Sequence, residues 1–154
     1  MDPIFIIVIV AVFLIDFAIF GGLWFLGAWS RANRPETVND GKIGDVTGKP
    51  NCVSSLAEKA TYQIDPISYQ SDEREVWGEL VAAVESLPKT QIITNEPPYL
   101  YAESFSKIFG FVDDLELVQD EKEKIFHVRA ASRAGYSDNG VNRRRVEMLR
   151  KKLS

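Results

Sequence analysis

The feature that most constrains this chain is a long apolar run near its N-terminus. Residues 4–29 contain a single charged side chain, Asp16, and almost all the others are apolar. A helix of about 20 apolar residues crosses a bilayer, whereas a helix buried in a globular core is rarely apolar on every side. The run therefore predicts one transmembrane helix over 4–29, followed by a polar linker over 30–49 and a soluble domain over 50–154.

A cleaved signal sequence is the main alternative to a membrane anchor. Signal sequences begin with basic residues and carry an apolar stretch of about 7–15 residues. This chain begins with Asp2 and Pro3, and its apolar run is longer, although residues 28–30 resemble a cleavage site. Arg31 and Arg34 follow the run, so the positive-inside rule predicts a single-pass protein with its soluble domain in the cytoplasm.

Three residues within the run suggest contact with a second transmembrane helix. Asp16 lies near the middle of the span, where an ionisable group costs a few kcal/mol and usually faces protein or a cavity. Ala18 and Gly22 form a small-xxx-small pair, which lets two helices approach closely. A membrane-protein partner is one interpretation, and a protonated or snorkelling Asp16 in an ordinary anchor is the other.

The distribution of charge argues against a nucleic-acid partner. The formal net charge is −4, and six of the eighteen Lys and Arg residues lie in 143–152, so the rest of the chain is strongly acidic. The basic C-terminal segment fits either an anionic membrane surface or the solvated face of a terminal helix. Cys52 is the only cysteine, which excludes an internal disulfide.

Beyond residue 50 the periodicity predicts an α+β domain. Helical spacing predicts helices over 73–87 and over 142–152, the second with Asn142 as its N-cap. Alternating patterns predict four strands, over residues 90–94, 99–105, 111–118 and 124–131. A further short strand is predicted near 61–64. Because the connections are short, we expect an antiparallel sheet of four to five strands with two packed helices, behind the N-terminal transmembrane helix.

Cys52 and His127 are the candidate nucleophile and base of a small hydrolase. A reactive thiolate needs a neighbouring base, and Asp113 or Asp114 could orient the imidazole. The pattern is weak, because a buried Cys and a His on a strand are usually structural. We therefore favour a non-enzymatic module and keep the hydrolase as the alternative.

Four carboxylates gather on two of the predicted strands: Glu103, Asp113, Asp114 and Glu116. Such carboxylates suit calcium or magnesium, but their spacing matches no EF-hand loop, and the chain has no Cys or His cluster for zinc. We predict ion pairs with Arg129 and Arg133 instead, and neither a metal nor a cofactor.

Arg129, Arg133 and Ser137 are also candidates for binding an anion. They lie at a strand end and in a turn before a predicted helix, and a helix N-terminus with nearby arginines suits a phosphate. The alternative is that these residues serve only the turn and the cap of the helix.

Four segments of the soluble part resemble one protein family. They are PNCVSS (50–55), YLYAE (99–103), FGFVDDLE (109–116) and VRAASRAGYSDNGVNRRRVE (128–147). Over roughly residues 48–152 the chain resembles the family of domains of unknown function numbered 1499. The resemblance implies a small bacterial or plastid protein, often with an N-terminal anchor or export signal, and it brings no activity. Ala130 stands where the family usually has Ser, which implies that a hydroxyl there is not essential.

These observations predict a membrane-anchored interaction module of unknown biochemical activity. Its predicted partners are the lipid bilayer and a membrane protein, as in a subunit of a membrane complex. The resemblance points to a bacterial inner membrane or a plastid membrane, and exported relatives leave the opposite side open for the domain.

Overall fold

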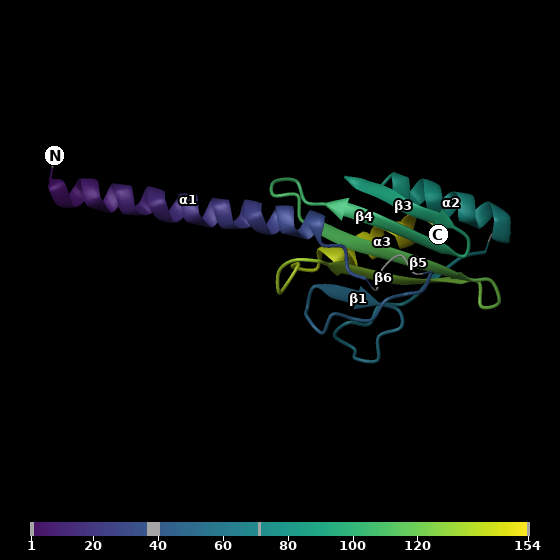
Figure 1. Cartoon of the computed structure of the whole chain (residues 1–154). Helices are drawn as coiled ribbons and strands as arrows, with labels where there is room; N and C mark the ends of the chain where they lie inside the picture. The colour runs from purple at the N-terminus through teal and green to yellow at the C-terminus, as the bar shows by residue number, and fades with distance from the viewer. Residues whose placement is uncertain (1, 37–40, 71, 154) are drawn as a thin grey trace.

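A computed structural model describes residues 2–36, 41–70 and 72–153, and a long helix precedes an antiparallel sheet and two further helices (Figure 1). The elements are α1 (Pro3–Ala32), β1 (Cys52–Ser54), β2 (Ile67–Ser68), α2 (Glu73–Glu85), β3 (Thr90–Glu96), β4 (Tyr99–Phe105), β5 (Val112–Asp120), β6 (Ile125–Ser132) and α3 (Val141–Lys152). The predicted α+β class, with an N-terminal apolar helix, an antiparallel sheet and two further helices, is confirmed.

The sheet has six strands in the order β1-β6-β5-β4-β3, and β2 also pairs with β6. All the strand pairs are antiparallel. The strand predicted near 61–64 is wrong, because only an isolated bridge joins Gln63 to Ser54 there. Its place is taken by β1 and β2. All three residues of β1 are buried, so this strand lacks the alternation by which a half-exposed strand is recognised.

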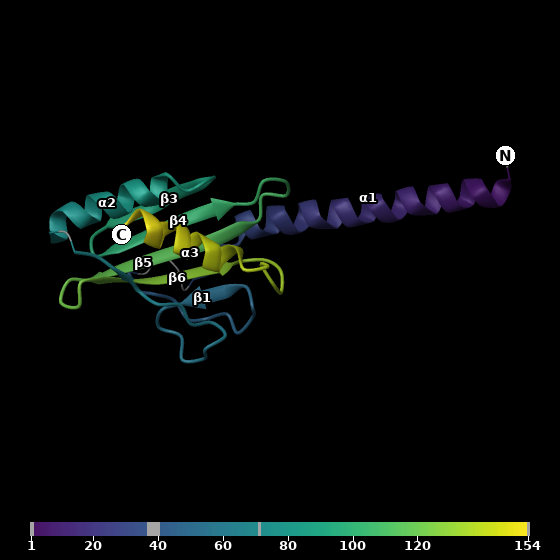
Figure 2. The same cartoon turned by 180° about the vertical axis from the view of Figure 1, so that it is seen from behind.

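Both α2 and α3 cover the same face of the sheet (Figure 2). Alternate residues of the strands point toward them and form one hydrophobic core. The core includes Leu100 and Ala102 of β4, Leu115 and Leu117 of β5, and Phe126 and Val128 of β6; the helices contribute Val76, Leu80 and Val84 of α2 and Val146 and Leu149 of α3. The apolar residues at two-residue spacing in the strands and at helical spacing in α2 and α3 thus pack together in this core.

The N-terminus of α3 differs from the prediction. Asn142 is not the N-cap; the cap is Gly140, in the left-handed region at φ 74°. The Asp138 carboxylate accepts the backbone N–H groups of Gly140 and Asn142, at 2.9 and 2.7 Å. The Asn142 side chain is buried and donates to the Asn51 carbonyl and the Ser132 hydroxyl, at 3.1 and 3.0 Å. It therefore ties α3 to β1 and β6.

Helix α1 is the one helix, within the described residues, that is long and apolar enough to cross a membrane. Most of its large side chains are exposed, whereas Gly27 and Ser30 are buried where its last turns meet the sheet. Part of the predicted linker, residues 37–40, lies outside the described residues. The boundaries at 29/30 and 49/50 stay predictions.

Candidate functional site at the junction of α1 and the sheet

The face of the sheet opposite the helices is polar and yet buried. Asp114, Glu116 and Arg129 project from β5 and β6 on this outer face, with residue exposures of 2, 0 and 3 %. Part of the predicted linker contributes to their cover, because the Asp45 carbonyl accepts from the Arg129 Nε at 2.8 Å. Asp45 of the predicted linker therefore contacts the sheet.

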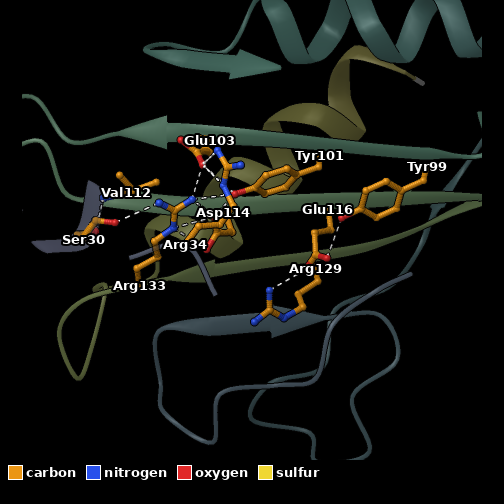
Figure 3. A network of polar contacts seen from close by, with 10 residues as sticks. All are labelled: Ser30, Arg34, Tyr99, Tyr101, Glu103, Val112, Asp114, Glu116, Arg129 and Arg133. Atoms are coloured by element: carbon orange, nitrogen blue, oxygen red, sulfur yellow. Dashed lines mark hydrogen bonds and ion pairs between the residues drawn. The ribbon is translucent and has the colours of Figure 1, made fainter. Parts of the chain in front are cut away.

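Two carboxylates stand directly opposite each other on this face. Glu103 of β4 pairs with Asp114 of β5, a placement in which like charges repel. Arg133, just after β6, bridges them, because its Nη2 lies 2.5 Å from Glu103 Oε1 and 2.7 Å from Asp114 Oδ1 (Figure 3). The Tyr101 hydroxyl lies 2.6 Å from the same Asp114 oxygen. We call Tyr101, Glu103, Asp114 and Arg133 the Arg133 network.

The end of α1 is part of this arrangement (Figure 3). Arg133 Nη1 donates to the Ser30 carbonyl at 3.1 Å, and the Val112 backbone N–H donates to the Ser30 hydroxyl at 2.9 Å. Just beyond the helix, Arg34 Nη2 lies 2.7 Å from Glu103 Oε1. The buried Ser30 thus joins the helix to β5 and to Arg133, and Arg34 adds a link to β4.

The β4–β5 loop makes a second attachment to α1. Arg31 Nη1 donates to the carbonyls of Phe109 and Gly110, both at 3.0 Å. A Cβ on Gly27 would lie 2.0 Å from the Phe109 carbonyl oxygen, so only glycine allows this approach. Further along the helix, the rings of Phe20 and Phe109 are 6.1 Å apart. The last turns of α1 are therefore clamped between the loop and the sheet.

The electrostatics of the network favour fixed charges over proton transfer. Burial opposes ionisation of Glu103, but hydrogen bonds from Arg133 and Arg34 outweigh it and hold the pKa of Glu103 below its usual value. Burial, and then the bond to Asp114, raise the pKa of Tyr101, which stays a neutral hydroxyl. The carboxylates of Glu103 and Asp114 thus balance the guanidinium groups of Arg133 and Arg34 in charge. Such an arrangement suits a structural role.

The carboxylates considered as metal ligands each pair with an arginine. Besides Glu103 and Asp114, Asp113 lies 2.8 Å from Arg145 and Glu116 lies 2.7 Å from Arg129. Burial raises the pKa of Glu116 above its usual value, although Arg129 opposes the shift. The predicted ion pairs with Arg129 and Arg133 are present.

Arg129, Arg133 and Ser137, the candidates for binding an anion, do not surround a common open site. Arg129 and Arg133 already have carboxylate partners, and their side chains are 4 and 2 % exposed. The Ser137 hydroxyl accepts the Asn139 backbone N–H at 3.3 Å in an exposed loop. An anion at the two arginines would have to displace buried carboxylates, which is costly.

The structure does not bring the Cys52–His127 pair together. Cys52 pairs with Ala131 across β1 and β6, and His127 lies four residues earlier on β6, about 13 Å away at the usual rise of a strand. His127 Nδ1 lies 3.3 Å from the Ser55 hydroxyl instead. Both candidate aspartates are bound to arginines, so the four residues form no catalytic group.

We expect Cys52 to be almost inert in the folded chain. The residue is 3 % exposed, and burial raises the pKa of its thiol above the usual value. Iodoacetamide at pH 8 should therefore label the native chain roughly a hundredfold more slowly than the urea-unfolded chain. Mass spectrometry over time measures both rates, and equal rates would show that the thiol is accessible.

Sequence reasoning missed several members of the junction. Arg133 after β6, together with Glu103 and Asp114, was visible as an ion-pair pattern. Nothing in the sequence placed Ser30 and Arg34 at this junction, because their partners lie 69 to 103 positions away in the chain.

A family model described as protein of unknown function (DUF1499) matches residues 42–153. No curated protein matches the sequence. The matched range includes the whole Arg133 network, whereas Ser30 and Arg34 precede it. The attachment of the network to α1 therefore lies outside the matched range.

Proposed function

We propose that this chain, which belongs to the DUF1499 family, is a membrane-anchored binding module that associates with a membrane-protein partner through α1. The observation that carries the proposal is the junction, where an exposed apolar helix continues without interruption into buried polar contacts with the domain. The family brings no activity with it, and the helix and its attachment to the domain support the proposal.

The junction supports a retained anchor over a cleaved signal sequence. Cleavage after Ser30 would remove the hydroxyl that accepts the Val112 N–H and the carbonyl that accepts from Arg133. A buried donor left without a partner costs about 1–3 kcal/mol. The exposed apolar side chains of α1 would then lie in the bilayer, with the domain on the cytoplasmic side that the positive-inside rule favours.

The contacts at the end of α1 favour a module that presents its domain in one orientation. A buried hydrogen bond on β5 and two exposed hydrogen bonds to the β4–β5 loop hold the end of α1 at two places. The alternative function, a small hydrolase, has no comparable support, because Cys52 and His127 lie about 13 Å apart on the sheet.

Helical geometry divides the predicted partner contacts between two faces of α1. At 100° per residue, Ala18 and Gly22 share one side, whereas Asp16 lies about 160° around the helix from Ala18. All three are exposed, and a Cβ on Gly22 would meet no atom within 4 Å. We therefore place close helix packing at Ala18 and Gly22, and treat Asp16 as a second, polar contact.

Crosslinking of the full chain in native membranes tests this proposal. We expect one stoichiometric membrane-protein partner, lost in Gly22→Leu, because a bulky side chain prevents the close approach. Gly21→Leu adds the same side chain about 100° around the helix and should keep the partner. Asp16→Leu tests the polar contact separately. No partner with the wild type, or equal crosslinking of Gly22→Leu and Gly21→Leu, would overturn the assignment of this face.

A further inference from the structure

A groove of about 650 Å³ lies where α1 meets the end of the sheet. Its walls come from α1, from the turn before β3, from the β4–β5 loop and from the loop between β6 and α3. The last two loops lie at the end of the sheet from which α1 projects (Figures 1 and 2). The volume is in the range of small-molecule sites, about 300–1,000 Å³.

The position of the groove along α1 sets its depth relative to a bilayer. Twenty residues from Ile4 reach Leu23, which is about 30 Å of helix and matches the thickness of the hydrocarbon core. Leu23 and Leu26, which line the groove, would therefore lie where the acyl chains meet the headgroups. Trp24 and Trp29 lie at the same level, as interfacial aromatic residues do.

The groove has an apolar wall and a basic rim. Its apolar lining comes from Leu23 and Leu26 of α1 and from Phe105, Phe111 and Val141 of the domain. Lys89 and Lys107 are exposed and also line the groove, and the Lys89 ammonium donates to the Lys107 backbone carbonyl at 3.4 Å.

The other charged side chains that line the groove are an ion pair and a carboxylate that caps a helix. Arg145 and Asp113 form an ion pair at 2.8 Å, and the Asp138 carboxylate accepts two backbone N–H groups at the start of α3. Within the described part of the chain, Lys89 and Lys107 take part in no ion pair. Three basic and two acidic side chains line the groove, so its formal charge is +1.

We infer that this groove binds one anionic phospholipid drawn from the bilayer. Its phosphate lies between the ammonium groups of Lys89 and Lys107, and part of one acyl chain lies along Leu23 and Leu26. The inference rests on the proposed membrane anchor, because only a helix within the bilayer brings the groove to the level of the headgroups. The ligand is a lipid, since a free phosphate would leave the apolar wall uncovered.

Native mass spectrometry of the full chain in detergent tests the site with phosphatidylglycerol, and with phosphatidylcholine as the zwitterionic comparison of zero net charge. We expect one phosphatidylglycerol per chain, bound more tightly than phosphatidylcholine. Lys89→Gln with Lys107→Gln should weaken it roughly thirtyfold, about fivefold for each basic residue near the lipid. Both lysines are exposed, so the fold should persist.

The matched control is Lys122→Gln with Lys124→Gln. It removes the same charge from the β5–β6 turn, at the other end of the sheet, and should leave binding unchanged. Inorganic phosphate should not displace the lipid at comparable concentration. Equal loss in the two double variants, equal binding of both lipids, or displacement by phosphate alone would each overturn the site.

Two further measurements test the lipid site independently of the membrane anchor and of how well the variants fold. A photoactivatable phosphatidylglycerol should label the wild type within residues 105–111, and labelling elsewhere only would count against the groove. Release of the chain from membranes by alkaline carbonate would refute the anchor itself. A chain that stays in the membrane but shows no preference for phosphatidylglycerol would refute the lipid site alone.

Discussion

Replacing Arg133 with Met should destabilise the full chain in detergent by about 3–5 kcal/mol, the cost of removing one partner from a buried ion pair. The substitution keeps an apolar stem but removes the guanidinium that separates Glu103 and Asp114. These carboxylates are direct neighbours on β4 and β5 and would then repel each other in a buried site. Urea unfolding followed by circular dichroism measures the loss.

Arg144→Met is the matched control for this prediction. Arg144 is exposed, and its Nη1 donates only to a backbone carbonyl, that of Asn139, at 2.8 Å. We expect this substitution to change the free energy of unfolding by less than about 0.5 kcal/mol. Similar losses for Arg133→Met and Arg144→Met would mean that the network contributes little.

The pH dependence of unfolding gives a second readout of the same variant. The pKa of Glu103 is lowered in the folded wild type, so its contribution is present above the unfolded pKa and is lost as the pH falls through the folded pKa. The wild type should therefore lose stability as the pH falls below about 4.3. In Arg133→Met the adjacent carboxylates should favour protonation, so the variant should gain stability as the pH falls from 7 toward 5.

Much of the α+β domain follows from periodicity in the sequence. Leu100 and Ala102 alternate with Tyr101 and Glu103 on β4, and this two-residue period places one pair in the core and the other on the outer face. Val146 of α3 keeps the helical spacing and is fully buried. Alternation and helical spacing are local properties, so the sequence carries them directly.

The junction could not be predicted in the same way. The linker is rich in Pro and Gly, which suggests a flexible tether, yet Arg34 and Asp45 contact side chains of β4 and β6. Such contacts depend on how α1 docks, and no period in the sequence encodes docking. The separation of Cys52 from His127 could not be predicted either, because the register of the three-residue strand β1 leaves no local pattern in the sequence.

Gly27→Ala should release the end of α1 from the sheet while leaving the core of the domain folded. The added Cβ would lie 2.0 Å from the Phe109 carbonyl oxygen and 3.0 Å from its carbon, both backbone atoms, so the helix or the loop has to move. Overpacking of this kind costs about 1–3 kcal/mol. The Val112 amide, which donates to the Ser30 hydroxyl, should then exchange its hydrogen roughly tenfold to a hundredfold faster.

Gly21→Ala is the matched control, because a Cβ at Gly21 meets no atom within 4 Å and the same glycine-to-alanine change favours the helix. Exchange at Val112 should stay at the wild-type rate in this variant, and amides of the core strands should exchange slowly in both. Unchanged exchange at Val112 in Gly27→Ala would mean that α1 does not rest on the β4–β5 loop. Leu23 and Leu26 line the groove only while α1 is docked. Gly27→Ala should therefore also weaken phosphatidylglycerol binding, since the proposed lipid site requires the docked helix.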